Sequence, residues 1–180
     1  MCSKAKPPGI AKPGRIKTNI DQFNDMLLAD ICYETDSSAK THGWTILVDE
    51  GTGWTVAKYL RGGKTWQELC DLIEEGWIDW AGPPSLFVAD IERGFIAEGL
   101  AMRLGKAGTV FTPSAGYAPW QKGQVERKVQ GSKTVVRKIV LHHEMSGPND
   151  MKLAAIEAVT ALNQRPGASG DSAAILQCAQ

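Results

Sequence analysis

Three acidic residues occupy positions where an acid is unusual. Asp30 interrupts the apolar run of residues 26–33, Asp90 directly follows the apolar run of residues 86–89, and Glu126 lies early in a stretch with helical spacing. A carboxylate inside a buried strand must be paired or bound to a cation, because an isolated buried charge is strongly unfavourable. An acid at a strand end or in a first helical turn also has a structural explanation, as a turn cap or as a complement to the helix dipole.

The combination and the spacing of these acids favour a metal site. Fifty-nine residues lie between Asp30 and Asp90, and thirty-five lie between Asp90 and Glu126. Two strands and a helix would each deliver one carboxylate, and such a cluster repels itself unless divalent cations lie between the oxygens. Two Mg²⁺ ions about 3.5–4 Å apart would activate an attacking oxygen and stabilise a leaving one in an in-line phosphoryl transfer. We therefore predict that Asp30, Asp90 and Glu126 are catalytic ligands of two Mg²⁺ (or Mn²⁺) ions.

Basic and amide side chains surround Glu126 in the same segment. Steps of four, three and four residues from Glu126 reach a glutamine and two bases on one helix face. Three further bases, Lys122, Arg127 and Lys128, flank that face. Such side chains would contact a phosphate backbone that extends from the metals, and phosphate contacts carry little sequence information. The alternative for each residue is a solvated basic face. The candidate phosphate-contacting residues are Lys122, Arg127, Gln130, Lys133 and Arg137.

The elements that must position these residues form a mixed α/β sheet. β-rich and apolar runs predict five strands, at residues 26–33, 44–48, 54–60, 86–89 and 109–111. Turn residues between the second and third strands indicate an antiparallel hairpin. Helices are predicted from Thr65, where Thr-x-x-Glu has the form of a capping box, and over residues 96–104, 121–143 and 148–163, with residues 112–122 as a loop. The expected fold class is α/β, a five-stranded mixed sheet flanked by helices.

Several segments resemble the catalytic domain of retroviral and retrotransposon integrases. Residues 119–127, Pro-Trp-Gln-Lys-Gly-Gln-Val-Glu-Arg, resemble the family's Pro-x-Gln-x-Gly-x-Val-Glu-Arg, and the thirty-five-residue spacing is also that of the family. Residues 23–31 resemble its first strand, residues 48–52 the hairpin after its second, and residues 162–166 its closing stretch. After Asp90 the family's Asn-Gly is absent, although the phenylalanine five positions later is kept.

This resemblance implies a ribonuclease H-like fold and a role in DNA integration. The family's Asp on the first strand, Asp after the fourth and Glu on the long helix bind metal, and they match Asp30, Asp90 and Glu126. The implied activity is processing of a DNA 3′-end followed by strand transfer into target DNA, and the implied active form is a homo-oligomer. The candidate phosphate-contacting residues are then predicted to bind DNA. One alternative is a catalytically inactive integrase remnant that only binds nucleic acid or protein, which the altered loop after Asp90 favours. Another is a ribonuclease H-like nuclease acting on RNA–DNA hybrids or junctions, against which the Val-Glu-Arg segment argues.

Length and composition agree with one globular domain. The chain has 180 residues, of which 43% are hydrophobic and 22% charged, and its formal net charge is zero. Residues 1–20 are rich in Lys, Pro and Gly and predict a linker or arm, with the catalytic core over residues 21–180. The neighbouring zinc and DNA-binding modules of an integrase are not recognisable, which suggests a fragment of a polyprotein or of a decaying element.

Its four scattered cysteines favour reduced thiols and an intracellular protein, nuclear when it acts on chromosomal DNA. No apolar run approaches the roughly 20 residues of a membrane span.

Overall fold

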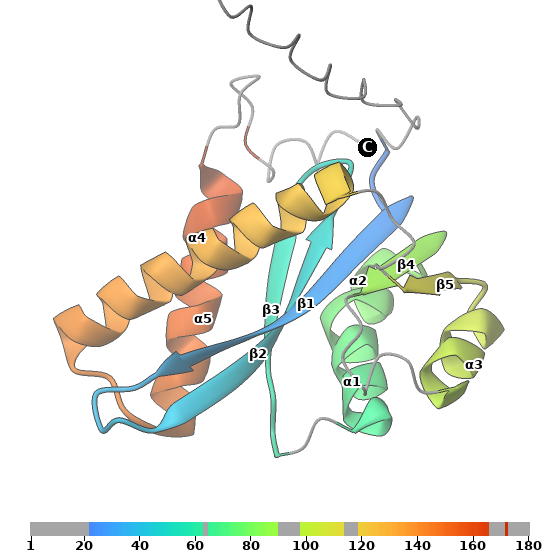
Figure 1. Ribbon diagram of the computed structural model, residues 1–180. Helices are drawn as coiled ribbons and strands as arrows, with labels where there is room; N and C mark the ends of the chain where they lie inside the picture. The colour runs from blue at the N-terminus through green and yellow to red at the C-terminus, as the bar shows by residue number, and fades with distance from the viewer. Residues whose placement is uncertain (1–21, 63–64, 90–97, 114–118, 166–171, 173–180) are drawn as a thin grey trace, which may run out of the picture.

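A computed structural model describes residues 22–62, 65–89, 98–113, 119–165 and Ser172, shown as coloured ribbon in Figure 1. Five strands and six helical segments follow one another in the predicted order of strands and helices. They are β1 (Met26–Thr35), β2 (Thr41–Asp49), β3 (Thr55–Tyr59), α1 (Trp66–Ile73), η1 (Glu74–Ile78), α2 (Asp79–Ala81), β4 (Leu86–Ala89), α3 (Glu98–Lys106), β5 (Val110–Pro113), α4 (Pro119–His143) and α5 (Gly147–Gln164). The predicted linker of residues 1–20 lies outside the described residues.

The strands form one mixed sheet in the order β3-β2-β1-β4-β5. β1, β2 and β3 pair antiparallel as consecutive hairpins, whereas β4 pairs parallel to β1 and β5 parallel to β4. The prediction of a five-stranded mixed sheet is therefore confirmed. Its central strand is β1, which has a neighbour on each side and carries Asp30.

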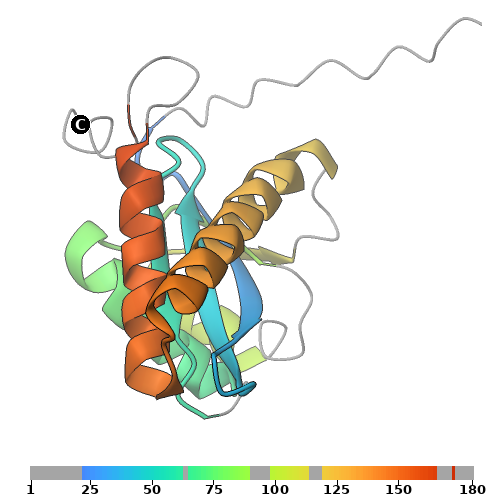
Figure 2. The same ribbon diagram turned by 90° about the vertical axis from the view of Figure 1, so that its left-hand side faces the viewer.

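Helices cover both faces of the sheet, which explains why β1 is apolar along almost its whole length. Leu28 and Cys32 belong to a core shared with α4 and α5, and Leu27 and Ile31 belong to a second core shared with α1, η1 and α3. Figures 1 and 2 show α4 and α5 together on one side of the sheet and α1 and α3 on the other. Side chains of a strand alternate between the two faces of the sheet. Even-numbered residues of β1 therefore face α4 and α5, and odd-numbered residues face α1 and α3.

Three helical segments differ from the predictions. Helix α3 ends at Lys106, two residues later than predicted. The helix that begins after Thr65 continues past α1 through a π-helical turn, η1, before it ends at Gly82, whose φ is 77°. Helix α4 begins at Pro119, two residues earlier than predicted. Proline is favoured in a first helical turn, where its missing N–H has no intrahelical partner. None of the helices in the described parts of the chain is long and apolar enough to cross a membrane.

Candidate metal and nucleic-acid site

Asp30 lies in the middle of β1, opposite Ile46 of β2. It has the same parity as Leu28 and Cys32, so its side chain belongs to the face that α4 and α5 cover. Its Oδ1 accepts a hydrogen bond of 2.8 Å from the backbone N–H of Ile31. Asp30 is half-buried, whereas its apolar neighbours are buried. The carboxylate therefore borders the core instead of lying within it, and from that position it could reach a ligand from solvent.

Asp90 lies outside the described residues, but the strand before it is described. Ala29 of β1 and Ala89 of β4 are register partners in the parallel pair. Asp30 and Asp90 thus each directly follow one member of this pair in the sequence.

Glu126 is exposed on α4, near the helix N-terminus. The helix packs on the sheet through Val129, Val136 and Val140, which are buried in the core that contains Leu28 and Cys32. Their spacings of seven and four place them on one side of the helix. Glu126 belongs to the first described turns of this packed helix, and its side chain remains accessible to solvent.

The relative level of Asp30 and Glu126 follows from contacts further along both elements. Beyond the end of β1, the Oγ of Ser37 donates a hydrogen bond of 3.4 Å to the carbonyl oxygen of Val140, near the end of α4. The chain therefore runs in the same direction along β1 and along α4. On β1, Glu34 lies four residues, about 13 Å, beyond Asp30. On α4, the bases that contact Glu34 lie seven and eleven residues, about 10 and 16 Å, beyond Glu126. The two acids therefore lie at a similar level on the same side of the sheet.

Those bases are Lys133 and Arg137, both predicted to bind DNA. Arg137 Nε donates to Glu34 Oε2 at 2.6 Å, and Lys133 Nζ lies 3.7 Å from Glu34 Oε1. The bond to Glu34 raises the pKa of the Arg137 guanidinium above its ordinary value. Arg127 and Gln130 are exposed, and the side chain of Lys122 is outside the described part of the chain.

Glu34 is a residue that sequence reasoning missed. Its spacing of four from Asp30 in one strand places both acids on the same face, and this was the available signal. Between them on that face lies Cys32, whose thiol pKa burial raises to about 12, with Lys133 opposing this shift and Asp30 and Glu34 adding to it. Cys32 is therefore a neutral core thiol at physiological pH.

The other buried acids of the hairpin region have structural roles. The carboxylate of Asp49 accepts from the N–H and the hydroxyl of Thr52, both at 2.7 Å, and from the N–H of Asn24 at 2.9 Å. Asp49 thereby closes the β2–β3 turn and fixes Asn24, which lies just before the start of β1. Within the described residues, which do not include Asp90, no three His, Cys, Asp or Glu side chains form a group that could hold a metal ion.

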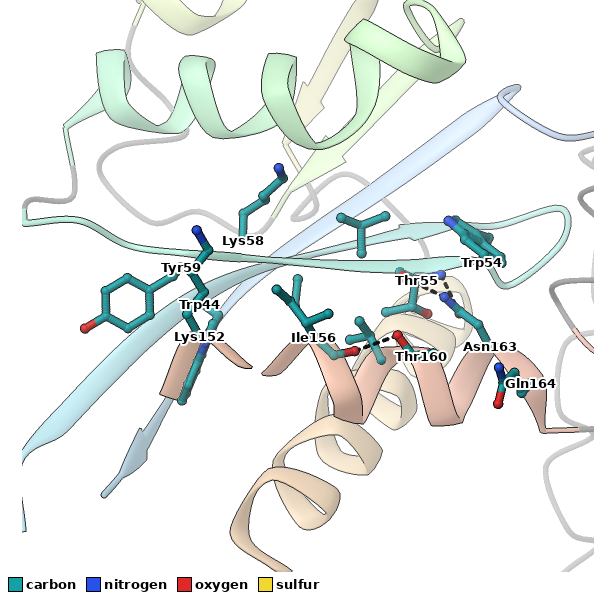
Figure 3. Close-up of a pocket in the computed structure, with 13 residues that line it drawn as sticks. Trp44, Trp54, Thr55, Lys58, Tyr59, Lys152, Ile156, Thr160, Asn163 and Gln164 are labelled. Carbon is teal, nitrogen blue, oxygen red and sulfur yellow. Dashed lines mark hydrogen bonds between the residues drawn. The ribbon is translucent and has the colours of Figure 1, made fainter. Parts of the chain in front are cut away.

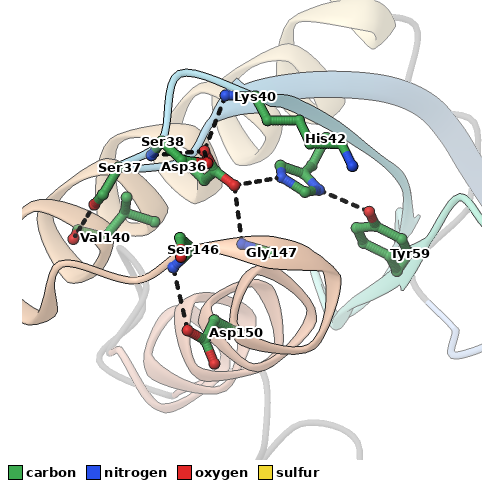
Figure 4. Close-up of polar contacts among 10 residues, drawn as sticks. All are labelled: Asp36, Ser37, Ser38, Lys40, His42, Tyr59, Val140, Ser146, Gly147 and Asp150. Carbon is green, nitrogen blue, oxygen red and sulfur yellow. Dashed lines mark hydrogen bonds and ion pairs between the residues drawn. The ribbon is translucent and has the colours of Figure 1, made fainter.

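Asp36 is the centre of a second buried network, shown in Figure 4. It accepts from Gly147 N at 2.9 Å, and its other partners are Ser38, Lys40 and the ring of His42. These bonds, that of Gly147 foremost, hold the pKa of the Asp36 carboxyl well below its ordinary value. Because Gly147 begins α5, Asp36 ties the β1–β2 turn to the α4–α5 turn, at the end of β1 remote from Asp30.

A groove of about 350 Å³ lies between β3 and α5 (Figure 3). Its lining includes Trp44, Ile156 and Asn163 but neither Asp30 nor Glu126. It is therefore separate from the predicted carboxylate site.

Comparison with known proteins finds matches for the structure but none for the sequence. No protein-family model matches the sequence, and no curated protein matches it. The structure is similar to the catalytic core domain of BIV integrase, with a TM-score of 0.70 and 16% identity over 87% of this chain and 95% of that one. The HTLV-2 integrase catalytic core domain in complex with magnesium, in its dimeric form, gives 0.66 and 18% over 84% and 94%.

A chain of the simian T-cell lymphotropic virus intasome in complex with a PP2A regulatory subunit gives a TM-score of 0.72 and 18% identity, over 85% of this chain and 54% of that one. All three comparisons cover most of the present chain. The chain therefore has the ribonuclease H-like fold of retroviral integrase catalytic core domains.

Proposed function

We propose that this chain is the DNA-integration domain of a retrotransposon-type integrase, a metal-dependent polynucleotidyl transferase that processes DNA 3′-ends and joins them to target DNA. The observation that carries the proposal is the common level and common sheet face of Asp30 and Glu126 in an integrase-like fold. The register pair Ala29–Ala89 supports the third ligand, because Asp90 is the next residue of the chain. A likeness of fold alone would not select this function, since one fold serves many activities.

Asp30, Asp90 and Glu126 would together hold two Mg²⁺ (or Mn²⁺) ions. Carboxylate oxygens suit these cations, and the half-buried and exposed positions of Asp30 and Glu126 leave space for water and phosphate ligands. When bound, the ions supply Lewis-acid activation of the attacking oxygen and stabilisation of the leaving one. The HTLV-2 core in complex with magnesium supports the same choice of metal.

DNA is the proposed partner, held through its phosphates along α4. Lys133 and Arg137 follow Glu126 along the helix, so a backbone that enters at the carboxylates would next meet these bases. Homo-oligomeric assembly is supported by the dimeric and trimeric forms of the HTLV-2 core. Action on chromosomal DNA would require the protein in the nucleus. The complete set of proposed DNA contacts is Lys122, Arg127, Gln130, Lys133 and Arg137.

Isosteric variants of the three acids test the proposal. Asp30→Asn, Asp90→Asn and Glu126→Gln keep side-chain shape but remove the charge that would bind metal. We expect each to lower Mg²⁺-dependent strand transfer on a labelled oligonucleotide by at least about 100-fold, the scale of losing one electrostatic contribution to catalysis. Glu157→Gln, on the exposed face of α5, is the matched control and should retain activity. Wild-type activity in Asp30→Asn or Glu126→Gln, with the fold verified by circular dichroism, would refute the assignment.

A second candidate is an inactive remnant that keeps the fold. The residues after Asp90, Ile91-Glu92-Arg93-Gly94, lack the Asn-Gly of the integrase pattern and favour this alternative. Mg²⁺ titration separates the two, because a ligand at 100 times its Kd stabilises the folded state by about 2.7 kcal/mol. A working site should show a Mg²⁺-dependent rise in Tm that Asp30→Asn abolishes, and a remnant should show none.

A further inference from the structure

Glu34 is a charged residue that the proposed chemistry does not use. It lies on β1, four residues beyond Asp30 on the same face, and its side chain is only 5% exposed. Its Oε2 accepts the 2.6 Å bond from Arg137 Nε. Its Oε1 is buried and accepts no hydrogen bond from the described residues, because Lys133 Nζ remains 3.7 Å away. The buried Glu34 carboxylate therefore faces two cations of α4, with a direct hydrogen bond to Arg137 and a longer contact to Lys133.

This arrangement affects what α4 offers to a phosphate backbone. The side chains of Arg137 and Lys133 are 58% and 28% exposed, so both remain accessible from solvent. A phosphate must nevertheless compete with Glu34 for them. Removing both bases from Glu34 would leave a buried carboxylate without a counter-charge, which is strongly unfavourable. Glu34 uses only the Nε–H of Arg137, so the other N–H groups of the guanidinium could still donate to a phosphate, but Glu34 and the phosphate would then share one positive charge.

We propose that Glu34 is a positioning residue that keeps Arg137 as its own counter-ion, which withdraws Arg137 from the DNA contacts proposed above, and leaves Lys133 as the base that DNA captures. The contact distances divide the two roles: Arg137 makes the direct hydrogen bond, and Lys133 makes the longer contact that is easier to release. Lys133 is also closer along α4 to Glu126, where the scissile phosphate would lie. The inference rests on the proposed function for the identity of the ligand, but the restraint on Arg137 does not depend on it.

The restraint is tested first without DNA. Phenylglyoxal modifies accessible arginine side chains, and mass spectrometry reads the rate at Arg137 in the intact folded chain. Glu34→Gln keeps the size of the side chain but removes its charge, and we expect it to accelerate modification of Arg137 several-fold. Glu157→Gln makes the same change of net charge on α5 and should leave the rate unchanged. Equal rates in wild type and Glu34→Gln, with both variants folded, would overturn the inference.

The second measurement is the salt dependence of binding to a fluorescent double-stranded oligonucleotide. Release of Arg137 in Glu34→Gln should add about one phosphate contact, which steepens the slope of log affinity against log salt by about 0.9. The ratio of the DNA affinity of Glu34→Gln to that of wild type should then fall about threefold between 50 and 200 mM salt.

Lys133→Gln should flatten the wild-type slope by the same amount, and Arg137→Gln should change it less. A slope in Glu34→Gln equal to that of Glu157→Gln contradicts the inference. Faster modification of Arg137 with no DNA binding by any variant would support the restraint and refute the proposed function.

Discussion

Asn163 closes the edge of the sheet, and its loss gives a sharp test of how this fold is held together. β3 has β2 as its only strand partner among the described residues, so its outer edge presents unpaired backbone groups. The side chain of Asn163, in α5, forms hydrogen bonds with both the backbone N–H and the backbone C=O of Thr55. Its Oδ1 accepts from Thr55 N at 2.9 Å, and its Nδ2 donates to Thr55 O at 2.8 Å. Thr55 is 1% and Asn163 3% exposed, so the side-chain amide replaces a neighbouring strand at a buried position.

The cost of removing this amide follows from the two groups that it satisfies. A buried donor or acceptor left without a partner costs about 1–3 kcal/mol, which gives about 2–6 kcal/mol for the Thr55 N–H and C=O in Asn163→Ala. Both residues also line the β3–α5 groove, through which water could reach the freed groups. We therefore expect the lower end, about 2–3 kcal/mol, and a fall in Tm of about 4–12 °C for a domain of this size.

Urea unfolding followed by tryptophan fluorescence measures this change as a shift in midpoint at constant slope. Asn149→Ala, on the exposed first turn of α5, is the control and should change stability by less than about 0.5 kcal/mol. Asn163→Asp separates hydrogen bonding from packing. Only the protonated carboxyl can donate to Thr55 O, so folding raises its pKa, and the stability that it recovers should be present at low pH and lost as pH rises. The reasoning would be refuted if Asn163→Ala lowered the free energy of unfolding no more than Asn149→Ala does. It would also be refuted if the stability of Asn163→Asp did not depend on pH.

Three further predictions follow from local geometry. The lowered pKa of Asp36 means that its contribution to stability is present above the pKa of the unfolded chain and is lost as pH falls. Asp36→Asn should therefore be less stable at pH 7 and show a weaker acid dependence of Tm. Cys32, with its thiol pKa raised to about 12 by burial, should react with iodoacetamide only on unfolding, as mass spectrometry after pulsed labelling would show. In α3, a Cβ on Gly99 would lie 2.8 Å from the ring of Trp66, whereas one on Gly105 would meet nothing within 4 Å. Gly99→Ala should cost about 1–3 kcal/mol in urea unfolding, and Gly105→Ala should add up to about 1 kcal/mol.

Features that depend on local sequence were predictable. The Thr-x-x-Glu segment predicted the start of the first helix, and Thr65 Oγ1 does accept from the N–H of Glu68 at 3.2 Å. The turn residues after Val48 predicted the β2–β3 hairpin, which Asp49 and Thr52 close. The apolar run around Asp30 predicted a central strand covered on both faces. In each case a few consecutive residues carry the physical cause.

Features that depend on distant partners were not predictable. The π-helical turn η1 positions Trp77, whose Nε1 donates at 2.7 Å to Asn24, fifty-three residues earlier. The bond between Arg137 and Glu34 joins residues 103 apart in the sequence. A periodic pattern shows which face of α4 is polar, but it does not show that a buried acid of another element lies opposite. The bases of α4 were therefore predicted as DNA contacts without the counter-charge that the structure places against them.

The geometry of the carboxylate site depends more on the apolar residues of β1 than on its acids. Leu27 and Ile31 belong to the core beneath α1 and α3, and Leu28 and Cys32 to the core beneath α4 and α5. A one-residue shift of this strand would turn every side chain to the opposite face and would carry Asp30 away from the layer that holds Glu126. Such a shift would also exchange two differently shaped sets of buried side chains, which close packing does not tolerate. The two hydrophobic cores thus select the sheet face that carries Asp30 and on which Glu34 contacts α4, and the chemistry proposed for that face depends on the packing beneath it.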